Sequence, residues 1–236
     1  MNFLETNKNL LDNAIECYYS IAEQKKYFGE KPKSRYYTFK YCFDNINNNV
    51  NPVIVELGTS RSFVDGRFEG CNSDDSKYWE PTNPEKWDWS AGIFTKVFST
   101  LFPNSRFYTV DLMNSHINRC RIMNDDNKNI IYNVSSSEDF LNNLKEKVDL
   151  LYLDTGDMTP IEDTAQLHLR EAKIIVEKDI VNKNGIILID DVKSIVPKIN
   201  GEISDLGKAK YSIPYFLENG YEIIMSEYQY VLRKQE

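Results

Sequence analysis

The spacing of apolar and polar positions changes near residue 52. Before it, apolar side chains recur every three or four positions, which predicts an amphipathic helix. A second helix is predicted over Lys33–Ile46, where the Asn47–Asn49 run and Pro52 end it. We expect residues 1–50 to form a helical cap on a larger domain. The apolar positions of the first helix are Leu10, Leu11, Ala14, Ile15, Tyr18, Tyr19 and Ala22.

After Pro52, short β-branched runs alternate with longer helical patterns. This alternation predicts an α/β domain over residues 51–236, with a Rossmann-like, doubly wound, mostly parallel sheet. Only two residues separate the last two runs, which predicts a C-terminal antiparallel hairpin at the sheet edge. The predicted strands are Val53–Leu57, Arg106–Asp111, Asn129–Val134, Val148–Leu153, Gly185–Ile189, Glu222–Met225 and Tyr228–Leu232. The predicted helices are Trp89–Leu101, Met113–Met123, Glu138–Leu144, Pro160–Val181 and Ala209–Glu218.

Two longer stretches interrupt the alternation. They are an insertion over residues 63–87 and a segment over residues 192–208, both containing glycine and proline. Loops of this length in a compact domain are usually lids or binding loops. Both follow the carboxyl end of a predicted strand, the edge at which open α/β sheets bind ligands. We therefore expect residues 192–208 to act as a lid.

Composition narrows the class of protein. The chain has 236 residues, 41% of them hydrophobic, and a formal net charge of −8. This acidity argues against a duplex-binding surface, which needs clustered Lys and Arg. The four cysteines form no CxxC pair, so we expect free thiols in a reducing compartment. No apolar run approaches the length of a membrane span and no secretory stretch is evident, so a cytoplasmic protein is predicted.

Candidate binding residues follow the first three predicted strands. In the turn Glu56-Leu-Gly58-Thr59-Ser60, small residues would let backbone N–H groups approach a ligand, although a plain strand-to-loop turn explains it equally. Asp111 ends the second strand, where a carboxylate can hold ribose hydroxyls. It could instead cap the following helix. Ser137 and Glu138 follow the third strand and could meet an adenine edge, or a serine here could be a helix cap.

Carboxylates also end two later strands. Asp154 and Asp157 follow one, and Asp190 and Asp191 follow another. Adjacent strands lie about 4.8 Å apart, so these side chains can converge. Clustered carboxylates repel unless they are neutralised, and a hard divalent cation is a natural partner for oxygen ligands. The alternative is that each aspartate caps a helix or turn independently.

The order of these motifs resembles the class I S-adenosylmethionine-dependent methyltransferases, from Pro52 to the C-terminus. The blocks Leu153-Asp154-Thr-Gly-Asp157 and Gly185-Ile-Ile-Leu-Ile-Asp190-Asp191 look most like metal-dependent small-molecule O-methyltransferases of the catechol and macrocin types. The turn departs from the family, which often has three glycines. The base position departs too, because Asp157 stands three residues after Asp154.

The resemblance implies a role for each motif. Glu56, Gly58, Thr59 and Ser60 would contact the methionine part of S-adenosylmethionine, Asp111 the ribose, and Ser137 and Glu138 the adenine. Asp154, Asp190 and Asp191 would hold Mg²⁺. Asp154 and Asp157 would be catalytic, with Asp157 as the general base and Lys193 and His116 in reserve.

The expected activity is metal-assisted O-methylation of a small polar acceptor such as a sugar, sugar nucleotide or glycan precursor. No nucleic-acid or membrane partner is expected, and analogy with sugar-modifying relatives suggests a homodimer. Two alternatives remain. A nucleotide-binding oxidoreductase is disfavoured because Gly58 lacks the other glycines of a pyrophosphate turn. A non-catalytic cofactor-binding or assembly subunit would not need clustered carboxylates.

Overall fold

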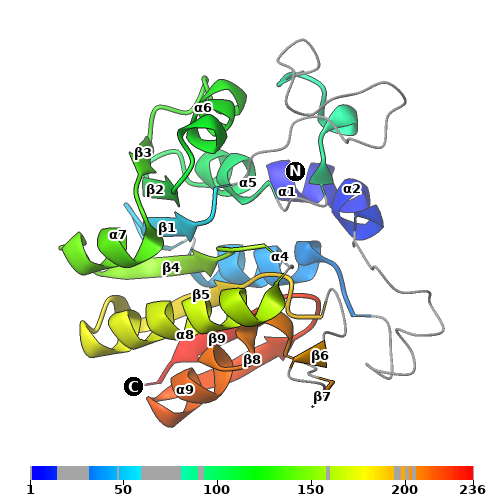
Figure 1. Cartoon of the computed structure of the whole chain (residues 1–236). Helices are drawn as coiled ribbons and strands as arrows, with labels where there is room; N and C mark the ends of the chain where they lie inside the picture. Colours follow the sequence, from blue (N-terminus) through cyan, green and yellow to red (C-terminus); the bar gives the residue numbers. More distant parts are fainter. Residues whose placement is uncertain are drawn as a thin grey trace.

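The computed structural model describes residues 2–14, 32–46, 48–59, 81–89, 93–157, 160–193, 198–199, 202–203 and 206–235. Within these ranges the centre of the protein is a mixed sheet with strand order β3-β2-β1-β4-β5-β9-β8 (Figure 1). Neighbouring strands from β3 to β5 are parallel, and β9 is antiparallel to both β5 and β8. This arrangement confirms the predicted doubly wound α/β fold with an antiparallel C-terminal hairpin. The strands are β1 (Val53–Leu57), β2 (Arg106–Asp111), β3 (Ile130–Val134), β4 (Val148–Leu153), β5 (Val181–Ile189), β8 (Tyr221–Ser226) and β9 (Tyr230–Lys234).

Helices cover both faces of this sheet (Figure 1). One face carries α1 (Phe3–Thr6), α2 (Lys8–Asn13), α4 (Arg35–Ile46), α5 (Phe94–Leu101) and the end of α6 (Asn114–Met123). The other face carries α7 (Ser137–Asn143), α8 (Ile161–Glu177) and α9 (Ser212–Glu218). Short 3₁₀ helices cover Pro84–Lys86 (η2) and Gly207–Ala209 (η4), and the two-residue strands β6 (Lys198–Ile199) and β7 (Glu202–Ile203) pair with each other.

Strand periodicity explains the two cores. Successive residues of a strand point to opposite faces, so Ile54 and Tyr152 join the core beneath α4 and α5. Val55 and Leu151 join the core beneath α8. The Tyr152 ring stacks on Phe94 with centroids 4.1 Å apart. Because the central strands are apolar on both faces, helix packing on each side fixes their register and brings their carboxyl ends to one edge.

Three predicted boundaries are wrong by four residues or more. The helix predicted to end at Val181 ends at Glu177, and β5 starts at Val181, four residues before the predicted strand. Asp179 has φ 51°, which breaks the helix although the apolar pattern continues. The helix predicted from Trp89 starts at Phe94, after Ile93 with φ 45°.

Parts of the predicted cap, insertion and lid lie outside the described residues. Residues 15–31 contain most of the first predicted helix, residues 60–80 most of the insertion, and residues 194–197, 200–201 and 204–205 much of the lid. The described part of the insertion packs on the body, where Trp87 and Trp89 are buried and stacked 5.7 Å apart. Among the helices that are described, none is long and apolar enough to cross a membrane.

Candidate active site

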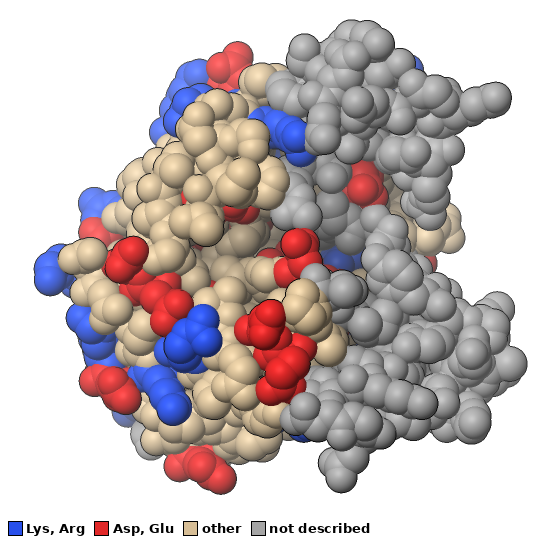
Figure 2. All heavy atoms as spheres, viewed as in Figure 1, with Lys and Arg blue, Asp and Glu red and all other residues tan. Residues whose placement is uncertain are grey.

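A cavity of about 400 Å³ lies at the carboxyl ends of β1, β2, β3 and β4. The strand order reverses between β1 and β4, and such a switch point separates the loops and opens a crevice. Figure 2 shows a hollow on this face of the molecule, with acidic side chains over α7 and the start of α8. Six predicted site residues line the cavity: Gly58, Asp111, Ser137, Glu138, Asp154 and Asp157.

The turn after β1 depends on glycine at position 58. Gly58 has φ +87°, and a Cβ built on it would lie 2.2 Å from the carbonyl oxygen of Asp154. Its N–H donates to the carbonyl oxygen of Val110 at 2.9 Å. The loops that follow β1 and β4 therefore touch backbone to backbone, which only glycine permits.

Glu56 and Thr59 lie beneath this turn and do not line the cavity. The Glu56 carboxylate is fully buried and accepts hydrogen bonds from the Thr95 and Thr109 hydroxyls. The Thr59 hydroxyl is 2.7 Å from that of Thr109. Ser60 lies outside the described residues. The predicted contacts of Glu56 and Thr59 with the methionine part of a cofactor stay predictions.

Asp111 joins the loops that follow β1 and β2. Its Oδ2 accepts a hydrogen bond from the Thr59 N–H at 3.2 Å. Its Oδ1 accepts one from the Met113 N–H at 2.8 Å and lies 3.0 Å from His116 Nδ1. The carboxylate thus holds the chain that enters α6, but it is not the helix cap that the alternative expected, because the N-cap residue is Met113. It also faces the cavity with lone pairs to spare on Oδ2.

The loop after β3 forms another wall of the cavity. Ser136, not Ser137, caps α7 by accepting a hydrogen bond from the Asp139 N–H at 3.0 Å. Ser137 is buried, and Glu138 forms an ion pair with Arg170 of α8, Nε to Oε1 3.0 Å. This pair fixes the position of the Glu138 carboxylate at the cavity.

The loop after β4 places two carboxylates differently. Asp157 is exposed, and its carbonyl oxygen accepts a hydrogen bond from Thr164. Asp154 is half-buried and faces Lys208, whose Nζ lies 2.6 Å from its Oδ1. Burial raises the pKa of Asp154, the nearby Asp190 and Asp191 raise it further, and Lys208 opposes the increase.

A buried polar group supports this loop from α8. The Thr155 hydroxyl donates to the Glu171 carboxylate at 2.8 Å, and the Thr155 carbonyl oxygen lies 3.0 Å from His168 Nε2. Burial raises the pKa of Glu171 to about 7 and lowers the pKa of His168 to about 3. Both side chains are fully buried, so near neutral pH the loop after β4 rests on a neutral imidazole and on a carboxyl that keeps its proton to a much higher pH than an exposed glutamate does.

The predicted convergence of Asp154, Asp190 and Asp191 is confirmed. One carboxylate oxygen from each lies within 4.8 Å of the others. The chain itself supplies cations beside them: Arg35 from α4 contacts Asp190 and Asp191, and Lys208 from η4 contacts Asp154 and Asp191. The two side-chain cations thus neutralise much of the negative charge that Mg²⁺ was predicted to neutralise. A divalent ion therefore fits these three carboxylates poorly.

Sequence reasoning missed both cations. Arg35 lies 155 positions before Asp190, so no local motif connects them. For Lys208 the sequence did contain a signal: a lysine directly after Gly207, at the end of the predicted lid, could have been considered as a residue of the site. The reserve base Lys193 points elsewhere and donates to the Ser226 carbonyl oxygen at 2.6 Å. The other reserve, His116, lines the cavity beside Asp111.

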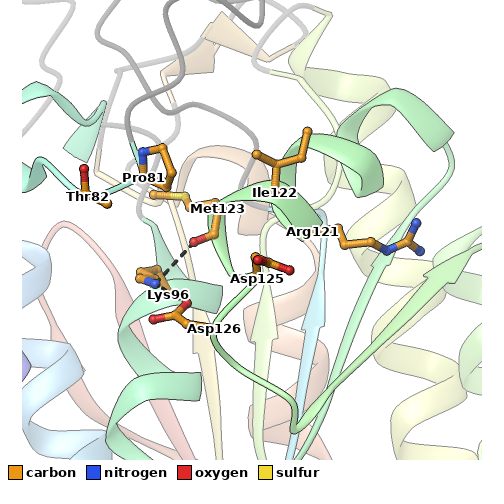
Figure 3. A pocket seen from close by; sticks show the side chains of 8 residues that line it. All are labelled: Pro81, Thr82, Lys96, Arg121, Ile122, Met123, Asp125 and Asp126. Atoms are coloured by element: carbon orange, nitrogen blue, oxygen red, sulfur yellow. Dashed lines mark hydrogen bonds and ion pairs between the residues drawn. The ribbon is translucent and has the colours of Figure 1, made fainter.

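A second cavity, of about 610 Å³, lies between residues 81–82, α5 and the end of α6 (Figure 3). Its buried lysine, Lys96, is paired with Asp126, Nζ to Oδ1 2.7 Å, and donates to the Met123 carbonyl oxygen at 3.2 Å. None of the predicted site residues that the structure describes lines it. We assign this cavity no role.

Comparisons with known proteins return matches of fold only. No family model and no curated protein matches the sequence. A Corynebacterium glutamicum protein determined as a structural genomics target has 11% identity and a TM-score of 0.54, over 100% of this chain and 98% of its own. The N-methyltransferase NodS from Bradyrhizobium japonicum, in complex with S-adenosyl-L-homocysteine, has 11% identity and a TM-score of 0.48 over 92% and 98%. Aeropyrum pernix fibrillarin, with natively bound S-adenosyl-L-methionine, has 16% identity and a TM-score of 0.45 over 83% and 73%.

Proposed function

We propose that this protein is an S-adenosylmethionine-dependent methyltransferase that methylates a hydroxyl of a small polar acceptor, such as a sugar, sugar nucleotide or glycan precursor. The observation that carries the proposal is the cavity at the switch point of the sheet, with Asp111 after β2 and Ser137 and Glu138 after β3. Its volume of about 400 Å³ is within the range of small-molecule sites.

The chemistry of the cavity walls suits the cofactor. Asp111 would accept hydrogen bonds from two ribose hydroxyls, and the loop after β3 would meet the adenine. The Gly58 turn would bring backbone close to the methionine part. The bound cofactor would supply an electrophilic methyl group.

The protein's own residues would align the acceptor and move its proton. Holding the nucleophile in line with the methyl group supplies much of the acceleration in such a transfer. Asp154 lines the cavity, and its contact with the Lys208 ammonium favours the ionised form that can accept a proton, against the opposing effect of burial. Asp157, at the exposed side of the cavity, stays a candidate. No step requires a metal ion.

The acidic surroundings favour a small acceptor over a polyanion. The chain carries a net charge of −8, and acidic side chains gather over α7 and the start of α8 on the described part of this face (Figure 2). A nucleic-acid backbone needs clustered cations. We therefore propose that the acceptor is not a nucleic acid.

Cofactor binding is the first test. Isothermal titration of S-adenosylmethionine and S-adenosylhomocysteine into the wild-type protein should show one site per chain. Asp111→Asn should weaken binding roughly 10- to 100-fold, because hydrogen bonds to a charged group contribute about 1.5–3 kcal/mol. Asp44→Asn, which removes one exposed charge on α4, is the matched control. Absence of binding to the wild-type protein would overturn the proposal.

The acceptor class is tested by measuring which compounds receive a labelled methyl group. Sugars, sugar nucleotides, glycan precursors and RNA are incubated with radiolabelled cofactor, and label is expected only in the small hydroxyl compounds. Label in RNA alone would contradict the proposed acceptor class and leave the cofactor assignment standing. Binding of NAD in place of S-adenosylmethionine would favour the oxidoreductase alternative.

A further inference from the structure

Among the described residues, five charged groups meet at the carboxyl ends of β4 and β5. Asp154, Asp190 and Asp191 supply three negative charges, and Arg35 and Lys208 supply two positive ones. The formal sum is −1, where three unpaired carboxylates would give −3. Arg35 and Lys208 are almost fully buried, so their charges act on the carboxylates with little screening by solvent.

Asp190 has no capacity for a further ligand. Its Oδ1 accepts from Arg35 Nε at 3.1 Å, Gln229 Nε2 at 3.0 Å and the Asp191 N–H at 2.8 Å. Its Oδ2 accepts from Arg35 Nη2 at 2.8 Å and from the Tyr152 hydroxyl. A carboxylate offers about four lone-pair positions. Asp190 therefore serves as the buried counter-ion of Arg35, leaving Asp154 and Asp191 as the carboxylates beside Lys208.

The backbone fixes Lys208 against these two carboxylates. Its neighbour Gly207 has φ +46°, and a Cβ there would lie 2.6 Å from the carbonyl oxygen of Val192. This close approach packs η4 against the residues that follow Asp191. Lys208 Nζ then lies 2.6 Å from Asp154 Oδ1 and 3.4 Å from Asp191 Oδ2, and the side chain is 1% exposed. The ammonium thus bridges the same two carboxylates that a cation shared between them would contact.

We propose that Lys208 is the resident cation of this cluster: its ammonium occupies the position that a divalent ion would take between Asp154 and Asp191. Two consequences follow. The wild-type protein needs no divalent metal, and removal of the ammonium converts the cluster into a divalent-cation site. A Mg²⁺ or Mn²⁺ ion needs carboxylate oxygens at about 2.0–2.1 Å, a distance that it cannot reach while the ammonium holds Asp154. The inference concerns the charge cluster alone and does not depend on the identity of the cofactor or acceptor.

The test measures metal binding in the absence of cofactor. Mn²⁺ is titrated into the wild-type protein and into Lys208→Met, an apolar variant of similar length, and free Mn²⁺ is followed by electron paramagnetic resonance. Lys208→Met should bind Mn²⁺ with a Kd at least tenfold lower than the wild type, equivalent to about 1.4 kcal/mol. Adding Asp154→Asn to Lys208→Met should abolish this gain, which assigns it to the cluster.

Lys96→Met is the matched control. Lys96 is also buried, but among the described contacts its ion pair is with the single carboxylate of Asp126. Its loss should create no tight Mn²⁺ site. Lys208→Arg, which keeps the positive charge, should behave as the wild type does.

Two results would overturn the inference. The first is that the wild-type protein binds Mn²⁺ as tightly as Lys208→Met does, and that Asp154→Asn removes this binding. The other is Lys208→Met that folds and gains no affinity. If Lys208→Met does not fold, the test is made on the wild-type protein. Its melting temperature should be the same with EDTA as with Mg²⁺ or Mn²⁺. A metal-dependent rise in melting temperature that Asp154→Asn removes would refute the proposal.

Discussion

Replacing Glu171 with glutamine should stabilise the protein at neutral and alkaline pH. The Glu171 side chain is fully buried on α8 under the cavity, where the Thr155 hydroxyl donates to it at 2.8 Å. Burial raises its pKa from an ordinary value of 4.5 to about 7, although its hydrogen bonds with Ser137 and Thr155 oppose the increase. Glutamine keeps the acceptor oxygen and cannot acquire the charge.

The sign of the effect follows from proton linkage. An unfolded chain gives up the Glu171 proton near pH 4.5, whereas the folded protein keeps it until about pH 7. The stability contributed by the neutral carboxyl is therefore fully present below pH 4.5 and is lost as the pH rises through 7. A pKa difference of this size corresponds to about 3 kcal/mol. This value applies without a discount for screening, because the group has no contact with solvent.

Urea unfolding from about pH 5 to pH 8.5 measures the effect. The wild type should lose about 2.5 kcal/mol of unfolding free energy relative to Glu171→Gln across this range, because part of the effect is already lost at pH 5. Glu177→Gln, which changes an exposed glutamate on the same helix, should follow the wild type. Parallel pH curves for the wild type and Glu171→Gln would refute the claim that burial holds this carboxyl neutral.

Two further substitutions test the backbone contact and the buried ion pair. Gly58→Ala should destabilise the protein by about 2–4 kcal/mol in urea unfolding, from strain at positive φ and from collision with the neighbouring loop. Gly220→Ala has the same strain, with φ +82°, but open space around it, so an equal loss there would contradict the steric argument. Arg35→Met should cost about 3–5 kcal/mol by leaving Asp190 charged and unpaired. Arg106→Gln, which breaks an exposed ion pair, should cost less than about 1 kcal/mol. Similar losses of stability in Arg35→Met and Arg106→Gln would show that burial does not determine the cost of breaking an ion pair.

The fold was accessible from the sequence because local patterns determine it. Alternating β-branched runs and helical periods locate every strand of the main sheet to within a few residues. The predicted boundaries are wrong where the backbone conformation of one residue ends an element although the apolar pattern continues, as at Asp179 after α8. The carboxylates of the cluster were also predictable, because parallel strands bring their ends together.

The partners of those carboxylates were not predictable from local patterns. Arg35 reaches Asp190 from a helix packed behind the sheet, a contact that depends on how α4 is oriented. A sequence shows three acidic groups that need neutralising and does not show what neutralises them. For that reason we expected a divalent ion from the sequence and did not expect the two buried side-chain cations, Arg35 and Lys208, that contact these carboxylates.

The long reach of Arg35 also orders events during protein synthesis. Its partner Asp190 is made 155 residues later, and Gln229, which donates to Asp190, 39 residues after that. Strand β9 separates β5 from β8, so β8 cannot join the sheet before β9 is present. A nascent chain therefore carries Arg35 without its partner until Asp190 has left the ribosome, and the open edge of β5 without its partner until residues 230–234 have followed. Because such distant contacts form slowly, the exposed edge is the point at which a chaperone that shields unpaired strands would act on the emerging protein.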